Sequence, residues 1–341
     1  MSVEHISKLA QSCFQGNPVI VLGSGASMPH GLPSMGNLAE YLRNHVSPTH
    51  GNEQTGWDAV AAELDAGKHL EAALEGKNLP DSLLQKIVRE TWNCVNEKDA
   101  EVFFGLAKDP TAFPLGRILS ALFQSTNVAV HVVTTNYDRV IEYACNSAGL
   151  LFNAGFTPGY LQTWEASGGV GFIIGGKQTR VVKIWKVHGS LDWFQTADDT
   201  VVGLPVFQLP DETHLPMIVT PGLNKYEKTH QDPFRSTISG ADAALRGASA
   251  FLTIGFGFRD QHIHPKIIQR CREKNVPIVV LARTLTDEAK SFLANSAGQN
   301  YLGIEFDNAV GSRAYTKENP DGFDIPDREL WSAEGFMSLV T

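Results

Sequence analysis

The chain has 341 residues, an apolar fraction of 43% and a formal net charge of −9 at pH 7. This length suits one large or two ordinary globular domains, and the negative charge argues against a surface that binds nucleic acid broadly. Residues 1–16 lack the features of a signal peptide, no stretch is apolar enough to span a membrane, and the four cysteines are scattered, so we expect a cytoplasmic protein.

The first two predicted elements are a helix and a buried strand. Apolar residues recur at helical spacing from Val3 to Cys13, and an apolar run follows at 18–22. The run ends in Gly23, Ser24, Gly25, Ala26 and Ser27. A strand-to-helix turn of this kind offers backbone N–H groups that can cradle a pyrophosphate, so it predicts a nucleotide site. Met28 stands where the third glycine of the dinucleotide fingerprint belongs, which leaves a simple turn as the alternative.

Residues 37–125 have helical periodicity throughout, with apolar residues three or four apart, as at Leu38 and Leu42. We expect a helical insertion there, between the first two strands of a sheet, where it forms one wall of a cleft. Residues 166–176 are rich in glycine, which predicts a hairpin or a loop.

The rest of the chain alternates between strands and helices. Strands are predicted at 128–133, 181–187, 217–220, 251–254 and 276–281, and helices at 241–245 and 261–272. This alternation predicts an α/β fold, a Rossmann-like and mainly parallel sheet with a helical insertion. Three strands end in polar clusters, at 134–138, 188–190 and 255–260. Ligands bind beyond the carboxyl ends of such strands, so these clusters and the glycine turn predict one crevice.

The carboxyl-terminal part of the chain has a weaker pattern. Beyond about residue 308 the periodicity fades, and polar turn residues dominate until Leu330 and Trp331. We expect residues 1–308 to form one catalytic domain. Residues 309–341 are expected to be an extension that contacts another subunit or a partner.

Five motifs follow one another in a fixed order along the chain. They are the glycine turn at 23–27, Gly31-Leu32-Pro33, the cluster at 134–138, His188-Gly189, and a Gly-Phe-Gly-x-x-Asp-x-His sequence at 255–262. This ordered set resembles the SIR2 (sirtuin) superfamily over about residues 15–285. It is most similar to prokaryotic SIR2-like proteins of antiviral defence, such as the SIR2 subunit of SIR2–HerA type systems.

The resemblance implies that NAD is the substrate and gives roles to the residues of the motifs. It implies an NAD-binding set of Gly23, Ser24, Gly25, Ala26, Ser27, Pro33, Thr135, Asp138, Gly255 and Asp260. In this set the glycine turn holds the phosphates, Asp138 the nicotinamide carboxamide, and Gly255 with Asp260 the adenosine side. Asn136 and His188 are the expected catalytic residues. The Asn136 amide can hold a water and a ribose hydroxyl together, and the His188 imidazole can act as a base near neutral pH.

Some of these residues also have a plain structural interpretation. Thr135 and Asp138 satisfy a capping box for a helix that begins near Tyr137. His188 could end its strand with a hydrogen-bonded ring. His30 could touch the substrate, although a solvent-exposed turn is the expectation.

Two other polar groups are expected to be structural. His262 and His264 lie close to Asp260, but a spacing of two on a helix points side chains apart, which favours helix-start polarity over a metal site. Lys177, Arg180, Lys183 and Lys186 could form a local basic patch. Because they alternate with apolar residues, one solvated strand face is the expectation.

Two departures from the deacetylase branch bear on the reaction. Deacetylating sirtuins carry two Cys-x-x-Cys pairs for zinc, whereas the four cysteines here lie far apart, so no structural zinc is expected. Deacetylases continue after Gly-x-Pro with Asp-Phe-Arg, whereas this chain has Ser34, Met35 and Gly36. We therefore expect an NAD+ glycohydrolase (NADase) that forms nicotinamide and ADP-ribose. The alternatives are a sirtuin-type ADP-ribosyltransferase or deacylase, and a non-catalytic scaffold that senses NAD or ADP-ribose.

Regulation is expected to come from other chains. The resemblance implies depletion of NAD during antiviral defence, and a constitutive NADase would be toxic to its own cell. We expect a homo-oligomer controlled by a separate protein, such as a HerA-type ATPase or an Argonaute-like protein. The loop at 28–35 is expected to move over the site. No direct binding to nucleic acid or to a membrane is expected.

Overall fold

The computed structural model describes residues 3–49, 51–111, 113–165, 171–220, 222 and 231–341. Its main sheet consists of β1 (Val19–Leu22), β2 (Ala129–Thr134), β3 (Leu151–Asn153), β7 (Val181–Lys186), β11 (Phe251–Ile254), β12 (Ile278–Ala282), β13 (Tyr301–Asp307), β14 (Gly311–Tyr315) and β15 (Phe323–Pro326). The strand order is β15-β14-β13-β12-β11-β1-β2-β7-β3. All neighbouring pairs from β13 to β3 are parallel, and the pairs β13–β14 and β14–β15 are antiparallel. This mainly parallel α/β sheet confirms the predicted fold class.

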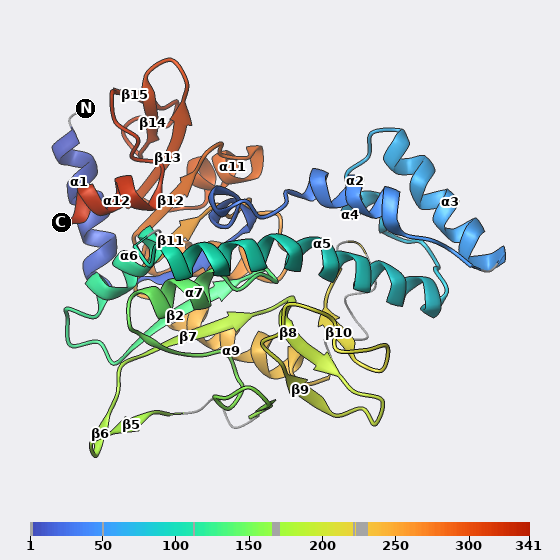
Figure 1. Ribbon diagram of the computed structural model, residues 1–341. Helices are drawn as coiled ribbons and strands as arrows, with labels where there is room; N and C mark the ends of the chain where they lie inside the picture. Colours follow the sequence, from blue (N-terminus) through green and yellow to red (C-terminus); the bar gives the residue numbers. More distant parts are fainter. Residues whose placement is uncertain (1–2, 50, 112, 166–170, 221, 223–230) are drawn as a thin grey trace.

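Helices cover both faces of the main sheet (Figure 1). One face packs against α1 (Val3–Gln15), α6 (Pro114–Leu122), α7 (Val140–Ser147) and α12 (Ala333–Val340), and the other against α9 (Phe234–Gly247), α10 (His264–Lys274) and α11 (Asp287–Asn295). Along β1, Ile20 and Leu22 face the first layer, and Val19 and Val21 face the second. A strand buried on both faces must be apolar at every position, which explains the uninterrupted apolar run of β1.

The stretch between β1 and β2 is helical, as expected. It contains α2 (Met35–His45), α3 (Gly51–Asp65), α4 (Leu70–Leu74) and α5 (Asp81–Lys108), followed by α6. These helices share a core of their own, which includes Leu38, Trp57 and Leu83. The long helix α5 also reaches the main core, where Trp92 and Val102 pack. Figure 1 shows α5 running from the α2–α4 lobe across the main sheet, so this helix joins the two parts.

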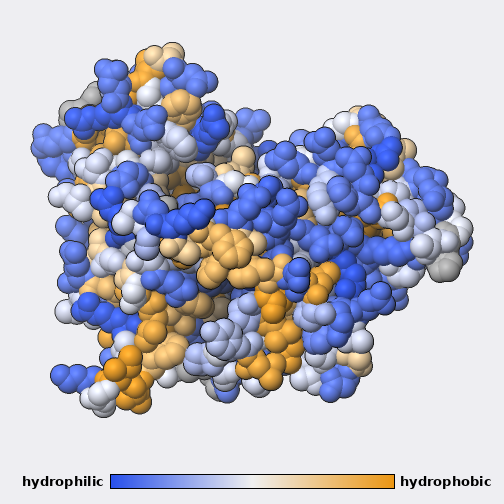
Figure 2. Space-filling model, viewed as in Figure 1, coloured by the Kyte–Doolittle hydropathy of each residue, from blue (hydrophilic) through white to orange (hydrophobic). Residues whose placement is uncertain are grey.

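A smaller antiparallel sheet and a hairpin lie beside β7. The sheet has the order β10-β8-β9-β4 and consists of β4 (Gln162–Thr163), β8 (Gly189–Gln195), β9 (Val201–Gly203) and β10 (Leu215–Ile218). The hairpin pairs β5 (Ile173–Ile174) with β6 (Lys177–Gln178). It forms part of the hairpin or loop predicted at 166–176, of which residues 166–170 lie outside the described residues. Figure 2 shows apolar surface over this hairpin, where Ile173 is 74% exposed.

The carboxyl-terminal residues pack against the main sheet and its helices, and the boundary expected near residue 308 stays a prediction. Strands β14 and β15 extend the main sheet, and α12 packs against α1 and α6. Phe336 and Leu339 of α12 are buried in the main core. The sequence periodicity fades here because β14 and β15 are short strands joined by polar turns. No helix of the described residues is long and apolar enough to cross a membrane.

Candidate active site at the carboxyl ends of the strands

The glycine turn after β1 packs directly against the turn after β11. Gly255 has a φ of +60°, and a Cβ at this position would lie 2.2 Å from the carbonyl carbon of Gly25. A Cβ at Gly23 would lie 2.4 Å from the Gly255 carbonyl oxygen. Real Cβ atoms do not come this close to backbone, so the close approach of the two turns requires glycine. The glycines therefore join two strand ends of the crevice.

The amides of the glycine turn are mostly used within the protein. The N–H groups of Gly23 and Gly25 donate to the carbonyls of Ile254 and Gly255, and those of Ala26 and Ser27 donate to Gly23 and Ser24. The turn continues as two short 3-10 helices, at 24–26 and 28–30. The next α-helix, α2, begins only at Met35. Four of the five amides in the turn are therefore used within the protein, and the pyrophosphate cradle expected here stays a prediction.

Asn136 is held rigidly by the glycine turn. Its side-chain Nδ2 donates to the Gly23 carbonyl at 2.9 Å and to Ser27 Oγ at 3.0 Å, and its backbone N–H donates to Thr134 Oγ1. These bonds use both N–H groups of the amide and leave its Oδ1 without a hydrogen-bond partner among the described residues. Asn136 is half-buried. A fixed, partly accessible acceptor can order a water or a sugar hydroxyl.

His188 forms an ion-pair contact with Asp260. The His188 Nε2 and Asp260 Oδ2 atoms are 3.1 Å apart, and both are buried without a hydrogen-bond partner in the described chain. The other carboxylate oxygen accepts the backbone N–H groups of His262 and Ile263 at 2.9 and 2.8 Å. Burial opposes ionisation of Asp260, but the contact with His188, together with the two N–H groups, outweighs it and holds the pKa of Asp260 below the usual range.

This contact bears on the roles expected for Asp260 and His188. The role of Asp260 beside the adenosine stays a prediction, while its carboxylate contacts the His188 ring. The side chains of His188 and Asp260 are 16% and 6% exposed, so the pair is largely shielded from water. Because Nε2 lies against the carboxylate, Nδ1 is the ring nitrogen left to take a proton. A carboxylate that orients a histidine in this way is a common arrangement in general-base catalysis.

Asp138 is buried at the end of the same loop as Asn136. Burial raises the pKa of its carboxyl to about 6, with attraction from Lys186 lowering it and repulsion from Asp99 raising it. Its Oδ1 accepts the backbone N–H of Val140. The capping box considered for Thr135 and Asp138 is not formed, because α7 begins at Val140 and its N-cap residue is Arg139, whose side chain makes no capping hydrogen bond.

Asp138 is next to a buried ionic cluster, which consists of Asp99, Arg139, Glu142, Lys186 and Asp192. Lys186, fully buried, donates to the Asp138 carbonyl and to Glu142 Oε1, the latter at 2.8 Å. The Arg139 guanidinium contacts Asp99 at 2.7 Å and Asp192 at 2.9 Å. Asp99 comes from α5, Arg139 and Glu142 from the α7 region, and Lys186 and Asp192 from β7 and β8. The cluster therefore ties the loop that carries Asn136 and Asp138 to three separate elements.

These cluster residues were not predicted as parts of the site. The sequence pattern favoured a solvated strand face for the lysines of 181–186, but β7 lies inside the sheet, between β2 and β3, and Lys186 has no exposed surface. A charged residue within an apolar strand was the available signal. Such a residue, once buried, needs an ionic partner.

The remaining predicted residues are placed as follows. The N–H of Thr135 donates to the Leu22 carbonyl at 3.4 Å, so Thr135 lies at the junction of β1 and β2. Pro33 is partly buried on the loop before α2. His30 stacks on Phe113, with ring centroids 4.7 Å apart, and is therefore not the free, solvent-exposed turn residue that was expected.

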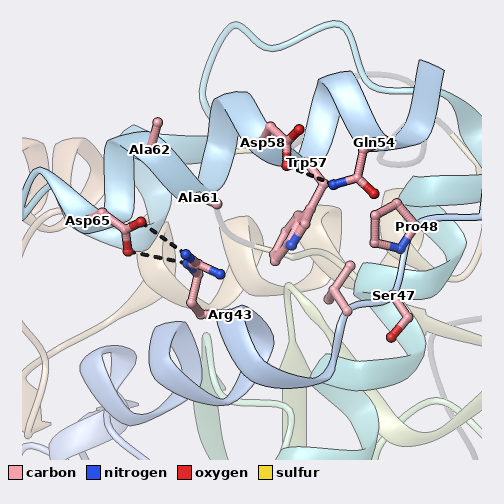
Figure 3. Close-up of a pocket in the computed structure, with 10 residues that line it drawn as sticks. Arg43, Ser47, Pro48, Gln54, Trp57, Asp58, Ala61, Ala62 and Asp65 are labelled. Carbon is pink, nitrogen blue, oxygen red and sulfur yellow. Dashed lines mark hydrogen bonds and ion pairs between the residues drawn. The ribbon is translucent and has the colours of Figure 1, made fainter. Parts of the chain in front are cut away.

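The cavity in Figure 3 lies elsewhere. It has a volume of about 550 Å³ and is lined by residues of α2, α3 and the loop between them, including Arg43, Trp57 and Asp65. Arg43 and Asp65 already form two hydrogen bonds with each other, at 3.2 and 3.0 Å. No predicted site residue lines this cavity. Within the described part of the chain, no group of three or more His, Cys, Asp or Glu residues is placed to hold a metal ion.

Comparison with known proteins bears on the region that carries the polar clusters. Residues 130–297 match the family described as SIR2-like domain. The match includes Asn136, Asp138, His188 and Asp260 and begins after the glycine turn. It supports the resemblance to the SIR2 superfamily over this region of the chain. A search among curated proteins found no match.

Several solved structures are similar to this chain. One, described as "Structural Basis for the Mechanism and Regulation of Sir2 Enzymes", has 13% identity and a TM-score of 0.43, over 84% of this chain and 87% of that one. Sir2 bound to an acetylated peptide has 13% identity and a TM-score of 0.41, over 84% and 89%. A complex of Sir2, a p53 peptide and NAD+ has the same four values.

Proposed function

We propose that this chain is an NAD+ glycohydrolase, which converts NAD+ and water to nicotinamide and ADP-ribose. One observation carries the proposal. Asn136, with its fixed side-chain oxygen, and His188, in contact with Asp260, follow the carboxyl ends of two neighbouring strands. Thr134 and Lys186 are paired in register on β2 and β7, and Asn136 and His188 each lie two residues beyond. Both side chains therefore arise at neighbouring strand ends.

The proposed step follows from the bond that breaks. As the C1′–N bond of the nicotinamide riboside opens, its electron pair goes to the ring nitrogen, and the sugar becomes oxocarbenium-like. Asn136 Oδ1 holds a water toward C1′, the water oxygen forms the new C–O bond, and His188 Nδ1 takes the released proton. The Asp260 carboxylate stabilises the resulting imidazolium. Fixed groups of this kind act by positioning and by stabilising charge that develops in the transition state.

The other NAD contacts are part of the proposal. We propose that Asp138 binds the nicotinamide carboxamide. Its carboxyl group lies next to Ser27, with which it forms a side-chain hydrogen bond. We propose that Ser24, Pro33, Thr135 and the backbone around Gly255 line the remaining path of the dinucleotide. Since four amides of the glycine turn are occupied, side-chain hydroxyls and the chain beyond the turn are the groups left to meet the phosphates.

The cellular role is proposed from the motif resemblance alone. We propose that the activity depletes NAD in antiviral defence and is silent until a partner, such as a HerA-type ATPase or an Argonaute-like protein, releases it. A homo-oligomer with contacts through residues 309–341 is part of this proposal, as is movement of the loop at 28–35. Met28 and Met35 at its ends are 46% and 41% exposed.

The test is nicotinamide release by the purified full chain, alone and with the product of the neighbouring gene. Asn136→Ala is expected to abolish release while the circular dichroism spectrum stays unchanged. Asn295→Ala, at an exposed position on α11, is the matched control and is expected to keep full activity. Parental turnover in the Asn136 variant would refute the assignment. Release that requires an acylated or acceptor protein would favour the deacylase or transferase alternative.

A further inference from the structure

A second cavity lies on the face of the main sheet that α9 covers. Its volume is about 290 Å³, near the lower end of small-molecule sites, and its lining includes Asn153 of β3, Lys183 and Trp185 of β7, Trp164, Glu165 and the small residues of α9. None of the proposed NAD-binding or catalytic residues lines it. It is therefore distinct from the strand-end site.

Two indole rings line this cavity, and both are held in place. Trp185 Nε1 lies 3.1 Å from His131 Nδ1, to which it donates. Gly240 of α9 gives Trp185 its room, because a Cβ there would lie 2.1 Å from the ring. Trp164 packs edge-on against Phe156 and Trp193, with centroids 5.2 and 6.2 Å away. Rigid aromatic walls favour a planar ligand, since no side-chain freedom is lost when it stacks.

Two polar groups of the cavity, the Trp164 N–H and the Lys183 ammonium, have no hydrogen-bond or ion-pair partner among the described residues. Trp164 Nε1 is buried and donates to no acceptor among the described residues. A buried donor without a partner costs free energy, and a ligand acceptor would remove that cost. Lys183 is half-buried and belongs to none of the ion pairs of the described chain.

Lys183 is the positively charged residue among those that line this cavity. Its cross-strand neighbours are His131 and Asn153. Burial, and then the Lys183 charge, lowers the pKa of His131, so His131 is neutral at pH 7. Glu165 lines the cavity too and has an interaction partner of its own. A cavity lined by this lysine and by two indole rings suits an anionic group attached to an aromatic ring.

We infer that this cavity is a binding site for a small aromatic anion, either a nucleoside monophosphate or an aromatic carboxylate. The ring lies against Trp164 and Trp185, the anionic group meets Lys183, and an acceptor on the ligand takes the Trp164 N–H. This site is independent of the proposed NADase, because neither ligand class carries the bond that the enzyme cleaves.

The experiment titrates the full chain with four probes by calorimetry and tryptophan fluorescence. AMP and nicotinic acid are the anions, and adenosine and nicotinamide are their neutral counterparts. At least one anion is expected to bind saturably and at least tenfold more tightly than its neutral counterpart. Binding of AMP alone would identify the nucleotide source, and binding of nicotinic acid alone the carboxylate source.

Lys183→Gln keeps the stem and a polar end, so the fold is expected to survive, as circular dichroism can verify. It is expected to reduce anion affinity to that of the neutral probe. Lys177→Gln, on the exposed hairpin strand β6, is the matched control and should bind like the parent. The inference is overturned if neither anion binds saturably, or if the folded Lys183 variant binds both as tightly as the parent.

Discussion

Replacing Asp260 by Asn separates the electrostatic role of its carboxylate from its structural role. The amide keeps an oxygen that can accept the N–H groups of His262 and Ile263, so the turn before α10 is preserved. What is lost is the negative charge 3.1 Å from His188 Nε2. Turnover is therefore expected to fall with little change in the melting temperature.

The size of the effect follows from the geometry. At 3.1 Å, Coulomb attraction between carboxylate and imidazolium is about 5 kcal/mol for an effective dielectric constant of about 20, which is an upper limit. Hydrogen bonds to charged groups contribute about 1.5–3 kcal/mol net. Because about 1.4 kcal/mol in the barrier is tenfold in rate, we expect nicotinamide release to slow about 10-fold to 150-fold.

The assay measures nicotinamide release across pH for Asp260→Asn and for a matched pair elsewhere. His214 Nδ1 and Asp211 Oδ1 lie 2.8 Å apart, and the Asp211 side chain is 55% exposed. Asp211→Asn therefore removes a similar carboxylate–histidine contact outside the site and is expected to leave the rate unchanged. If Asp260→Asn has the parental rate and pH profile, His188 does not act through this contact and the proposed proton transfer is wrong.

Three further predictions concern the loop, the ionic cluster and metal. Nicotinamide release should rise as pH increases through about 6, as Asp138 ionises, and Asp138→Asn should lose this limb of the pH profile. Lys186→Met leaves the Glu142 charge buried and unpaired, so chemical denaturation should show a loss of about 3–5 kcal/mol, which Lys186→Met combined with Glu142→Leu should largely restore. Dialysis against EDTA should change neither the melting temperature nor turnover, and elemental analysis should find no stoichiometric zinc.

The central strands were predictable because residues buried on both faces of a sheet form an apolar run in the sequence. β1 and β11 lie in the middle of a parallel sheet with helices on both faces, so β1 is apolar at every position and β11 at every position except Thr253. The polar clusters that follow the strands were found for the same reason, since they interrupt apolar runs. The Asn136–Ser27 and Asn136–Gly23 bonds were not predictable, because they join residues more than a hundred positions apart.

Short and antiparallel elements were harder to predict. β8, β9 and β10 alternate imperfectly and are stabilised by pairing with one another, which no local pattern records. The same holds for β14 and β15, whose polar turns suggested a tail outside the domain. The Asp260–His188 contact was not predicted either. Asp260 also accepts a backbone N–H near the start of α10, and this local role gives no sign of a contact with His188.

The environments of the two lysines on β7 could not be predicted from the sequence pattern. Along β7, Val182 and Ile184 face the α7 side, as does Lys186 through Glu142, whereas Lys183 and Trp185 line the cavity under α9. An alternation of lysine with apolar residues has the appearance of one solvated face, yet the lysines at 183 and 186 differ by an odd number and so point to opposite faces. Each lysine therefore has a separate environment. Lys186 supports the loop of the candidate active site. Lys183, three residues away on the same strand, is the cation of a second cavity, and this strand ends two residues before His188.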